Sequence, residues 1–125
     1  MFGGVDASGD FVALGQSGYV GLETFPNPGV SKIEMTSDEL TALGPVNEQP
    51  DLYTVAIEYE PNALCLESKS LKLYLGSFRN EVAFCETLAV KIRDDVAAAL
   101  ELEHPKVRVT LRQKARGGIT IVATA

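Results

Sequence analysis

The chain has 125 residues, a length that suits one domain with one hydrophobic core. Hydrophobic residues make up 46% of it, charged residues make up 22%, and the formal net charge is −6. An acidic balance argues against a nucleic-acid partner, because affinity for a phosphate backbone comes largely from Lys and Arg. Small-molecule ligands are therefore the expected partners.

Membrane and metal partners are not expected either. No apolar run approaches the roughly 18 residues that a spanning helix needs, and the N-terminus lacks the basic and apolar regions of a secretory signal. We therefore expect a cytoplasmic protein. Two cysteines and one histidine are too few for a disulfide scaffold or a metal cluster, so no metal site is predicted.

The N-terminal quarter is rich in Gly, Ser and Pro, so residues 1–31 are predicted to be mostly irregular and residues 32–125 to form a single domain. Val30 to Met35 suits a short strand. Residues 36–43, TSDELTAL, suggest one helical turn with a Thr or Ser cap. Gly, Pro and Asn then predict a loop that ends at Pro50 and Asp51.

Two strand-like runs come next. Apolar and polar residues alternate from Tyr53 to Glu60, as in a strand with one buried face. Ala63 to Glu67 follows a Pro-Asn turn and is predicted to be the hairpin partner of that strand.

Two helices are predicted between the strand pairs. The first runs from about Ser68, its expected N-cap, to Phe78. The second runs from about Glu81 to Leu102, with apolar residues at helical spacing and Asn80 as the expected N-cap.

Val107 to Arg112 and Ile119 to Thr124 are two more strands, separated by a glycine-containing turn. The resulting order β-β-α-α-β-β predicts an α+β fold in which both helices cover one face of an antiparallel four-stranded sheet. Such a small sheet leaves its edges unpaired, and closure of several copies into a ring would pair them. We therefore expect a homo-oligomer with sites between subunits.

The most informative polar stretch is Glu67 to Tyr74, ESKSLKLY. A carboxylate suits the N–H edge of a ring, and paired lysines suit a phosphate. The same residues also suit an ordinary helix start with solvated charges. The stretch alone leaves both interpretations open.

Several motifs in order resemble the family of NADPH-dependent 7-cyano-7-deazaguanine reductases (QueF), the nitrile reductases of queuosine biosynthesis. The matching segments are LETFPNP at 22–28, LGPVNEQPD at 43–51 (similar to LCPxTGQPD), ESKSLKLY at 67–74, SFRN at 77–80, FCE at 84–86 and RGGI at 116–119. The resemblance is to the single-unit branch. It implies the tunnelling fold, in which β-β-α-α-β-β units close into oligomeric barrels with sites at subunit interfaces.

The resemblance also implies roles for individual residues. Glu86 would grip the deazaguanine ring by its N–H edge, and Asp51 would be the proton donor. The remaining substrate-pocket positions are the backbone of Leu66 and the side chains of Glu67, Ser68 and Cys85. The implied NADPH contacts are Ser68, Lys69, Arg116 and Gly117.

Two departures from the family pattern affect the reaction. The family nucleophile is a cysteine that attacks the nitrile carbon and gives a thioimide, which NADPH reduces. Gly44 stands at that position here, and glycine cannot form a covalent adduct. Cys85 stands where the family has a substrate-pocket histidine, and Asn47 and Glu48 replace the usual Thr-Gly. Several changes around one site favour natural divergence over an engineered knock-out.

Three hypotheses follow. In the first, the chain reduces 7-cyano-7-deazaguanine to 7-aminomethyl-7-deazaguanine with NADPH, and Cys85 is a displaced nucleophile whose pKa is lowered at a helix start. The alternative interpretation is that Cys85 and Cys65 are small apolar residues that pack in the core. In the second, Asp51 provides acid–base catalysis for a non-reductive reaction. The archaeosine-forming reaction of a tRNA-modifying relative is disfavoured for this chain, because that relative needs the missing cysteine. In the third, the chain is a non-catalytic binder of a deazapurine or pterin ring.

Overall fold

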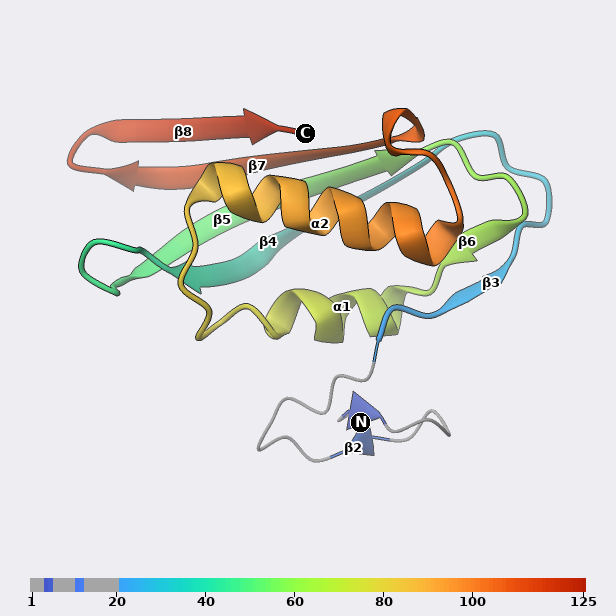
Figure 1. Ribbon diagram of the computed structural model, residues 1–125, viewed down its shortest axis with the longest axis horizontal. Helices are drawn as coiled ribbons and strands as arrows, with labels where there is room; N and C mark the ends of the chain where they lie inside the picture. The colour runs from blue at the N-terminus through green and yellow to red at the C-terminus, as the bar shows by residue number, and fades with distance from the viewer. Residues whose placement is uncertain (1–3, 6–10, 13–20) are drawn as a thin grey trace.

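The computed structural model describes residues 4–5, 11–12 and 21–125 (Figure 1). Two short strands, β1 (Gly4–Val5) and β2 (Phe11–Val12), form an antiparallel pair near the N-terminus. A second small pair joins β3 (Thr24–Pro26) to β6 (Leu64–Leu66). Within the part of the chain described, no helix is long and apolar enough to cross a membrane.

The main sheet has four antiparallel strands in the order β4-β5-β7-β8. Its strands are β4 (Ile33–Leu43), β5 (Pro50–Tyr59), β7 (Val107–Arg116) and β8 (Ile119–Thr124). Helix α1 (Ser68–Gly76) and helix α2 (Cys85–Leu100) both lie on one face of this sheet, and a 3-10 turn, η1 (His104–Lys106), leads into β7 (Figure 1). The predicted sheet with two helices on one face is confirmed.

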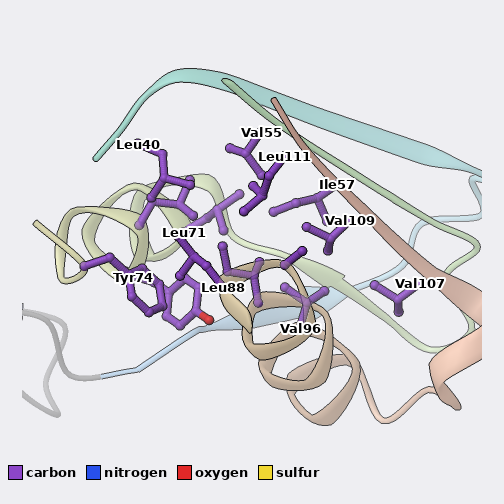
Figure 2. Packing of buried hydrophobic residues seen from close by; sticks show 14 of the residues in the cluster. Leu40, Val55, Ile57, Leu71, Tyr74, Leu88, Val96, Val107, Val109 and Leu111 are labelled. Carbon is purple, nitrogen blue, oxygen red and sulfur yellow. The ribbon is translucent and has the colours of Figure 1, made fainter. Parts of the chain in front are cut away.

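The core lies between the sheet and the helices. Every second residue of β5 points toward the helices and is buried, as the alternating sequence predicted. Figure 2 shows Val55 and Ile57 from β5 facing Leu71 of α1 and Leu88 of α2. The chain thus buries one side of the sheet and leaves the other side without a helix over it.

The helical turn predicted at residues 36–43 is wrong, because these residues continue β4. Leu40 and Ala42 alternate inward and are almost fully buried, and Ala42 pairs with Asp51 of β5. A register shift between Ser37 and Leu40 accommodates the polar TSDE segment. Pairing with β5 overrode the local helix-start signal.

The predicted hairpin partner of the 53–60 strand is also wrong. β6 pairs with β3, where Phe25 lies opposite Cys65, and β4 is the neighbour of β5 in the sheet. β3 lies inside the segment 1–31 that we expected to be irregular. The domain boundary near residue 31 stays a prediction.

Both predicted helix caps are wrong. Glu67, not Ser68, is the N-cap of α1, and it accepts hydrogen bonds from two backbone amides. Phe84, not Asn80, precedes α2, and no side chain caps that helix. Glu101 ends α2 in the left-handed conformation, with φ of 58°.

Candidate functional site

Five of the implied site positions gather at one end of the sheet, which we call the acidic end. It consists of Gly44 from the β4–β5 connection, Asp51 from the start of β5, Cys85 and Glu86 from the start of α2, and Arg116 from the end of β7. Figure 1 shows that both sheet turns and the first residues of α2 lie at this end. The topology therefore brings together residues that are far apart in the sequence.

Asp51 is the centre of the acidic end. Its side chain is only 9% exposed, and its Oδ1 lies 3.5 Å from Nε of Arg116. The Arg116 Nη2 also donates a hydrogen bond of 2.7 Å to the Pro50 carbonyl oxygen. Arg116 thus holds the start of β5 and neutralises the carboxylate beside it.

Gly44 is buried and faces Asp51. A Cβ atom added at Gly44 would lie 3.0 Å from Oδ2 of Asp51 and 3.7 Å from Oδ1 of Asn47. A side chain at position 44 would therefore point at the carboxylate that the resemblance assigns as proton donor. The loop closes through hydrogen bonds from the Gly44 amide to the Gln49 carbonyl and from the Glu48 amide to the Gly44 carbonyl.

Glu48 adopts a backbone conformation that favours glycine, with φ of 53°. The related motif has a glycine at this position. Glu48 thus adopts a glycine-like conformation at one of the three positions, 44, 47 and 48, where this loop differs from the motif.

Cys85 does not have the properties of a displaced nucleophile. It is 2% exposed, at the first residue of α2. Burial, together with the neighbouring charge of Glu86, raises the pKa of the Cys85 thiol to about 11, while a backbone hydrogen bond with Ala123 acts in the opposite direction. The lowered pKa expected at a helix start is therefore wrong, because burial of the thiol raises its pKa. Cys65 is also buried, as predicted for a packing residue.

Tyr53 lies beside the acidic end, two residues after Asp51 on β5, and the resemblance implied no role for it. It is 1% exposed, and its hydroxyl is buried without a hydrogen-bond partner among the described residues. Burial raises the pKa of Tyr53 well above its ordinary value, and the charges of Cys85, Asp51 and Glu86 raise it further. The alternating pattern predicted the inward direction of Tyr53 but gave no signal of an unpaired hydroxyl.

A second group of implied site residues lies at the start of α1. The carboxylate of Glu67 accepts hydrogen bonds from the amide of Lys69 at 2.8 Å and from the amide of Ser70 at 2.7 Å. The buried Ser70 hydroxyl donates to the Glu67 carbonyl oxygen and accepts from the Glu23 amide, both at 2.9 Å. These bonds fix the Glu67 carboxylate and tie α1 to the chain before β3.

The start of α1 lies toward the other end of the sheet from the acidic end (Figure 1). The Leu66 amide donates to the Tyr59 hydroxyl at 2.9 Å, so Glu67 lies near the last residue of β5, whereas Asp51 lies near its first. Asp51 and Tyr59 are eight positions apart, which is roughly 26 Å at about 3.3 Å per residue. One chain therefore does not bring Glu67, Ser68 and Lys69 together with Glu86 and Asp51.

The cationic and polar groups at both ends are accessible. Ser68 and Lys69 are exposed at the start of α1, and Arg116 and Gly117 are exposed at the β7–β8 turn. Gly117 has φ of 60°, and nothing lies within 4 Å of a Cβ built there. In the described part of the chain, no group of three or more His, Cys, Asp or Glu residues is arranged to hold a metal ion.

Comparisons with known proteins show the family of this chain. A family model described as "QueF-like protein" matches residues 50–125. Two proteins named NADPH-dependent 7-cyano-7-deazaguanine reductase are 46% identical to this chain. The one from Nitrosospira multiformis aligns over 107 residues, 82% of this chain and 76% of the relative. The one from Frankia casuarinae aligns over 105 residues, 83% of this chain and 82% of the relative.

The solved structures include a similar fold. The crystal structure of the archaeosine synthase QueF-Like in the apo form matches with a TM-score of 0.71 and 25% sequence identity, over 78% of this chain and 93% of that one. This likeness supports the α+β tunnelling fold that the motifs implied. Together with the family match and the two reductase relatives, it shows that the chain belongs to the family of QueF-like proteins.

Proposed function

We propose that this protein binds 7-cyano-7-deazaguanine, or a closely similar deazapurine, without attaching it covalently. One observation carries the proposal: the position that faces Asp51 is Gly44, which has no side chain to attack a nitrile. The acidic end does contain one thiol, that of Cys85, but this thiol is buried, and its raised pKa keeps it protonated at neutral pH. A thioimide step therefore has no available nucleophile there.

Recognition of the ring would use the carboxylates. Glu86 is exposed in the first turn of α2, where its charge suits the helix dipole, and a carboxylate can accept from the N–H edge of a purine-like ring. Phe84, which is 57% exposed beside it, offers an aromatic face. These two residues suit a flat ring with N–H donors, such as a deazaguanine or a pterin.

The complete site would form between two copies of the chain. Glu67, Ser68 and Lys69 lie at the opposite end of β5 from Glu86, so a second copy must supply them if they contact the same ligand. Strands β4 and β8 are the edges of the four-stranded sheet and offer backbone groups to a neighbouring copy. We therefore propose a homo-oligomeric barrel with the ligand at subunit interfaces.

NADPH is the proposed second ligand. The names of the reductase relatives contain it, and the exposed residues here fit its phosphates in chemistry: Lys69 and Arg116 are cationic, and Gly117 allows close backbone approach. Lys69 and Arg116 would come from different copies. The chain's own residues would bind and orient NADPH, and only in the second candidate function would the bound NADPH supply hydride.

The second candidate function is reduction of 7-cyano-7-deazaguanine to 7-aminomethyl-7-deazaguanine with NADPH. The 46% identity to two proteins named as reductases favours it. In this chain, Asp51 would deliver protons to the reduced nitrogen from beside Gly44.

The test combines calorimetric binding, intact mass and NADPH oxidation with 7-cyano-7-deazaguanine. We expect the wild type to bind the ligand with no mass adduct and no NADPH oxidation, and Glu86→Ala to lose binding. Gly44→Cys should form an adduct, because its thiol lies beside Asp51 after a small shift of that carboxylate. Gly76→Cys is the matched control, since its added side chain meets nothing within 4 Å and lies at the end of α1.

Three outcomes would change the conclusion. A wild-type adduct that disappears in Cys85→Ser restores the displaced nucleophile. NADPH oxidation by the wild type selects the second candidate. Failure of the wild type to bind the ligand overturns both candidate functions.

A further inference from the structure

The Tyr53 hydroxyl stands apart from those of the other tyrosines in residues 21–125. The Tyr59 hydroxyl accepts a hydrogen bond from the Leu66 amide, and the Tyr74 hydroxyl donates one to Asp95. The Tyr53 hydroxyl is the one buried side-chain polar atom in the described chain with no partner. A buried, unpaired hydroxyl is unfavourable for folding, so its presence points to a use outside the folding of the free chain.

Tyr53 lies close to the acidic end, on the face of the sheet that the helices cover. Tyr53 follows Asp51 by two residues on β5, so both side chains lie on the face of the sheet that the helices cover. Its ring is held in the core and therefore has little freedom to turn away. Asp51 and the start of α2 are its charged neighbours at this end, as the contribution of Cys85, Asp51 and Glu86 to its electrostatics indicates.

We infer that the Tyr53 hydroxyl donates a hydrogen bond to an acceptor atom of the ring that binds at the acidic end. This inference rests on the proposed function and adds a binding residue to it. The ligand class is a neutral aromatic heterocycle that carries N–H donors on one edge and a carbonyl or nitrile acceptor elsewhere.

The chemistry of the surrounding groups explains why a tyrosine is needed. Asp51 and Glu86 are carboxylates, which accept hydrogen bonds when ionised and offer no proton to a carbonyl or nitrile. The Tyr53 phenol is protonated at neutral pH even with an ordinary pKa, and burial only raises that pKa further, so it is a donor. Among the described residues no side chain caps the start of α2, so its first backbone amides are further donors at this end of the sheet.

A shift at the acidic end would open the path to this hydroxyl. Hydrogen bonds to a ligand are often unformed in a ligand-free protein and tighten in the complex. Two residues at the start of α2 are Cys85, which is buried and contributes to the electrostatics of Tyr53, and Phe84, which is exposed.

Tyr53→Phe is the test, because it removes only the oxygen. We expect the melting temperature of the ligand-free variant to stay equal to that of the wild type or to rise, and its affinity for 7-cyano-7-deazaguanine to fall by roughly tenfold, the typical effect of one lost hydrogen bond. Tyr74→Phe is the matched control: it loses the bond to Asp95, so its melting temperature should fall while its ligand affinity stays unchanged.

The outcomes separate this inference from the proposed function. If the wild type binds the ligand, Glu86→Ala does not, and Tyr53→Phe binds as the wild type does, then the Tyr53 inference is overturned and the proposed function stands. A clear fall in the melting temperature of ligand-free Tyr53→Phe also overturns it, because the hydroxyl would then serve the fold. Absence of wild-type binding overturns both.

Discussion

The cap formed by Glu67 gives the sharpest stability prediction. Both of its carboxylate oxygens accept backbone amides of α1, at 2.7 and 2.8 Å, on a half-buried side chain. Loss of a helix N-cap typically costs about 1 kcal/mol, and hydrogen bonds to a charged acceptor lie at the upper end of the range. We therefore expect Glu67→Ala to lower the free energy of unfolding by about 2 kcal/mol.

At roughly 4 °C per kcal/mol for a chain of this size, the melting temperature of Glu67→Ala should fall by about 8 °C. Glu67→Gln keeps one acceptor oxygen and should lose about half as much. Thermal unfolding without ligand, at one protein concentration, measures the effect. Amide hydrogen exchange should show faster exchange at Lys69 and Ser70, the two donors to the cap.

Glu60→Ala is the matched control for this experiment. This variant also loses a carboxylate contact, but that contact is an exposed ion pair in which Oε1 of Glu60 lies 3.4 Å from Nζ of Lys106. Such a pair contributes about 0.5 kcal/mol or less. Equal melting temperatures for Glu67→Ala and Glu60→Ala would refute the capping role and leave Glu67 as an ordinary surface charge.

Two other predictions concern α2. Cys85 should react slowly with iodoacetamide near pH 8 and faster as the pH approaches about 11, and rapid labelling at pH 8 would contradict the raised pKa. The free energy of unfolding should also fall between about pH 9 and 11, because the Cys85 thiol ionises at lower pH in the unfolded chain than in the folded chain. Cys85→Ala should remove that part of the fall. Glu101→Gly should raise the free energy of unfolding by about 1 kcal/mol in urea denaturation, because residue 101 has φ of 58° and glycine adopts it without strain; a loss of stability would show that the Glu101 side chain contributes something else.

The sequence predicted those parts of the fold in which one pattern dominates. β5 and β7 alternate cleanly, and α2 has apolar residues at helical spacing, so their types were clear. The 36–43 segment was misassigned because its Ser, Asp and Glu suggest a helix start, and only pairing with β5 reveals a strand. The pairing of β6 with β3 depends on contacts between distant segments, which local patterns do not contain.

The candidate site shows the same limit. The resemblance implied roles for Glu67, Asp51 and Glu86, but a linear sequence does not say that Glu67 lies at the far end of β5 from the other two. The unpaired hydroxyl of Tyr53 and the raised pKa of Cys85 depend on three-dimensional burial. Neither property can therefore be predicted from the sequence alone.

The geometry of α1 also changes what the intact ESKSLKLY segment means. Glu67 caps the helix, the Ser70 hydroxyl joins the helix to the Glu23 amide, and Leu71 and Tyr74 are buried in the core. Folding alone therefore needs half of this segment, whatever reaction the protein performs.

The evidence for a cofactor then depends on the exposed members of the segment, because core packing does not explain Ser68 and Lys72. Gly44 is the opposite case: it lies in a loop between two strands, where loss of a reactive side chain leaves the strands and the core in place. A change at position 44 can thus end covalent chemistry while the signature stays intact. For this reason the signature is strong evidence for the family and weak evidence for the reaction.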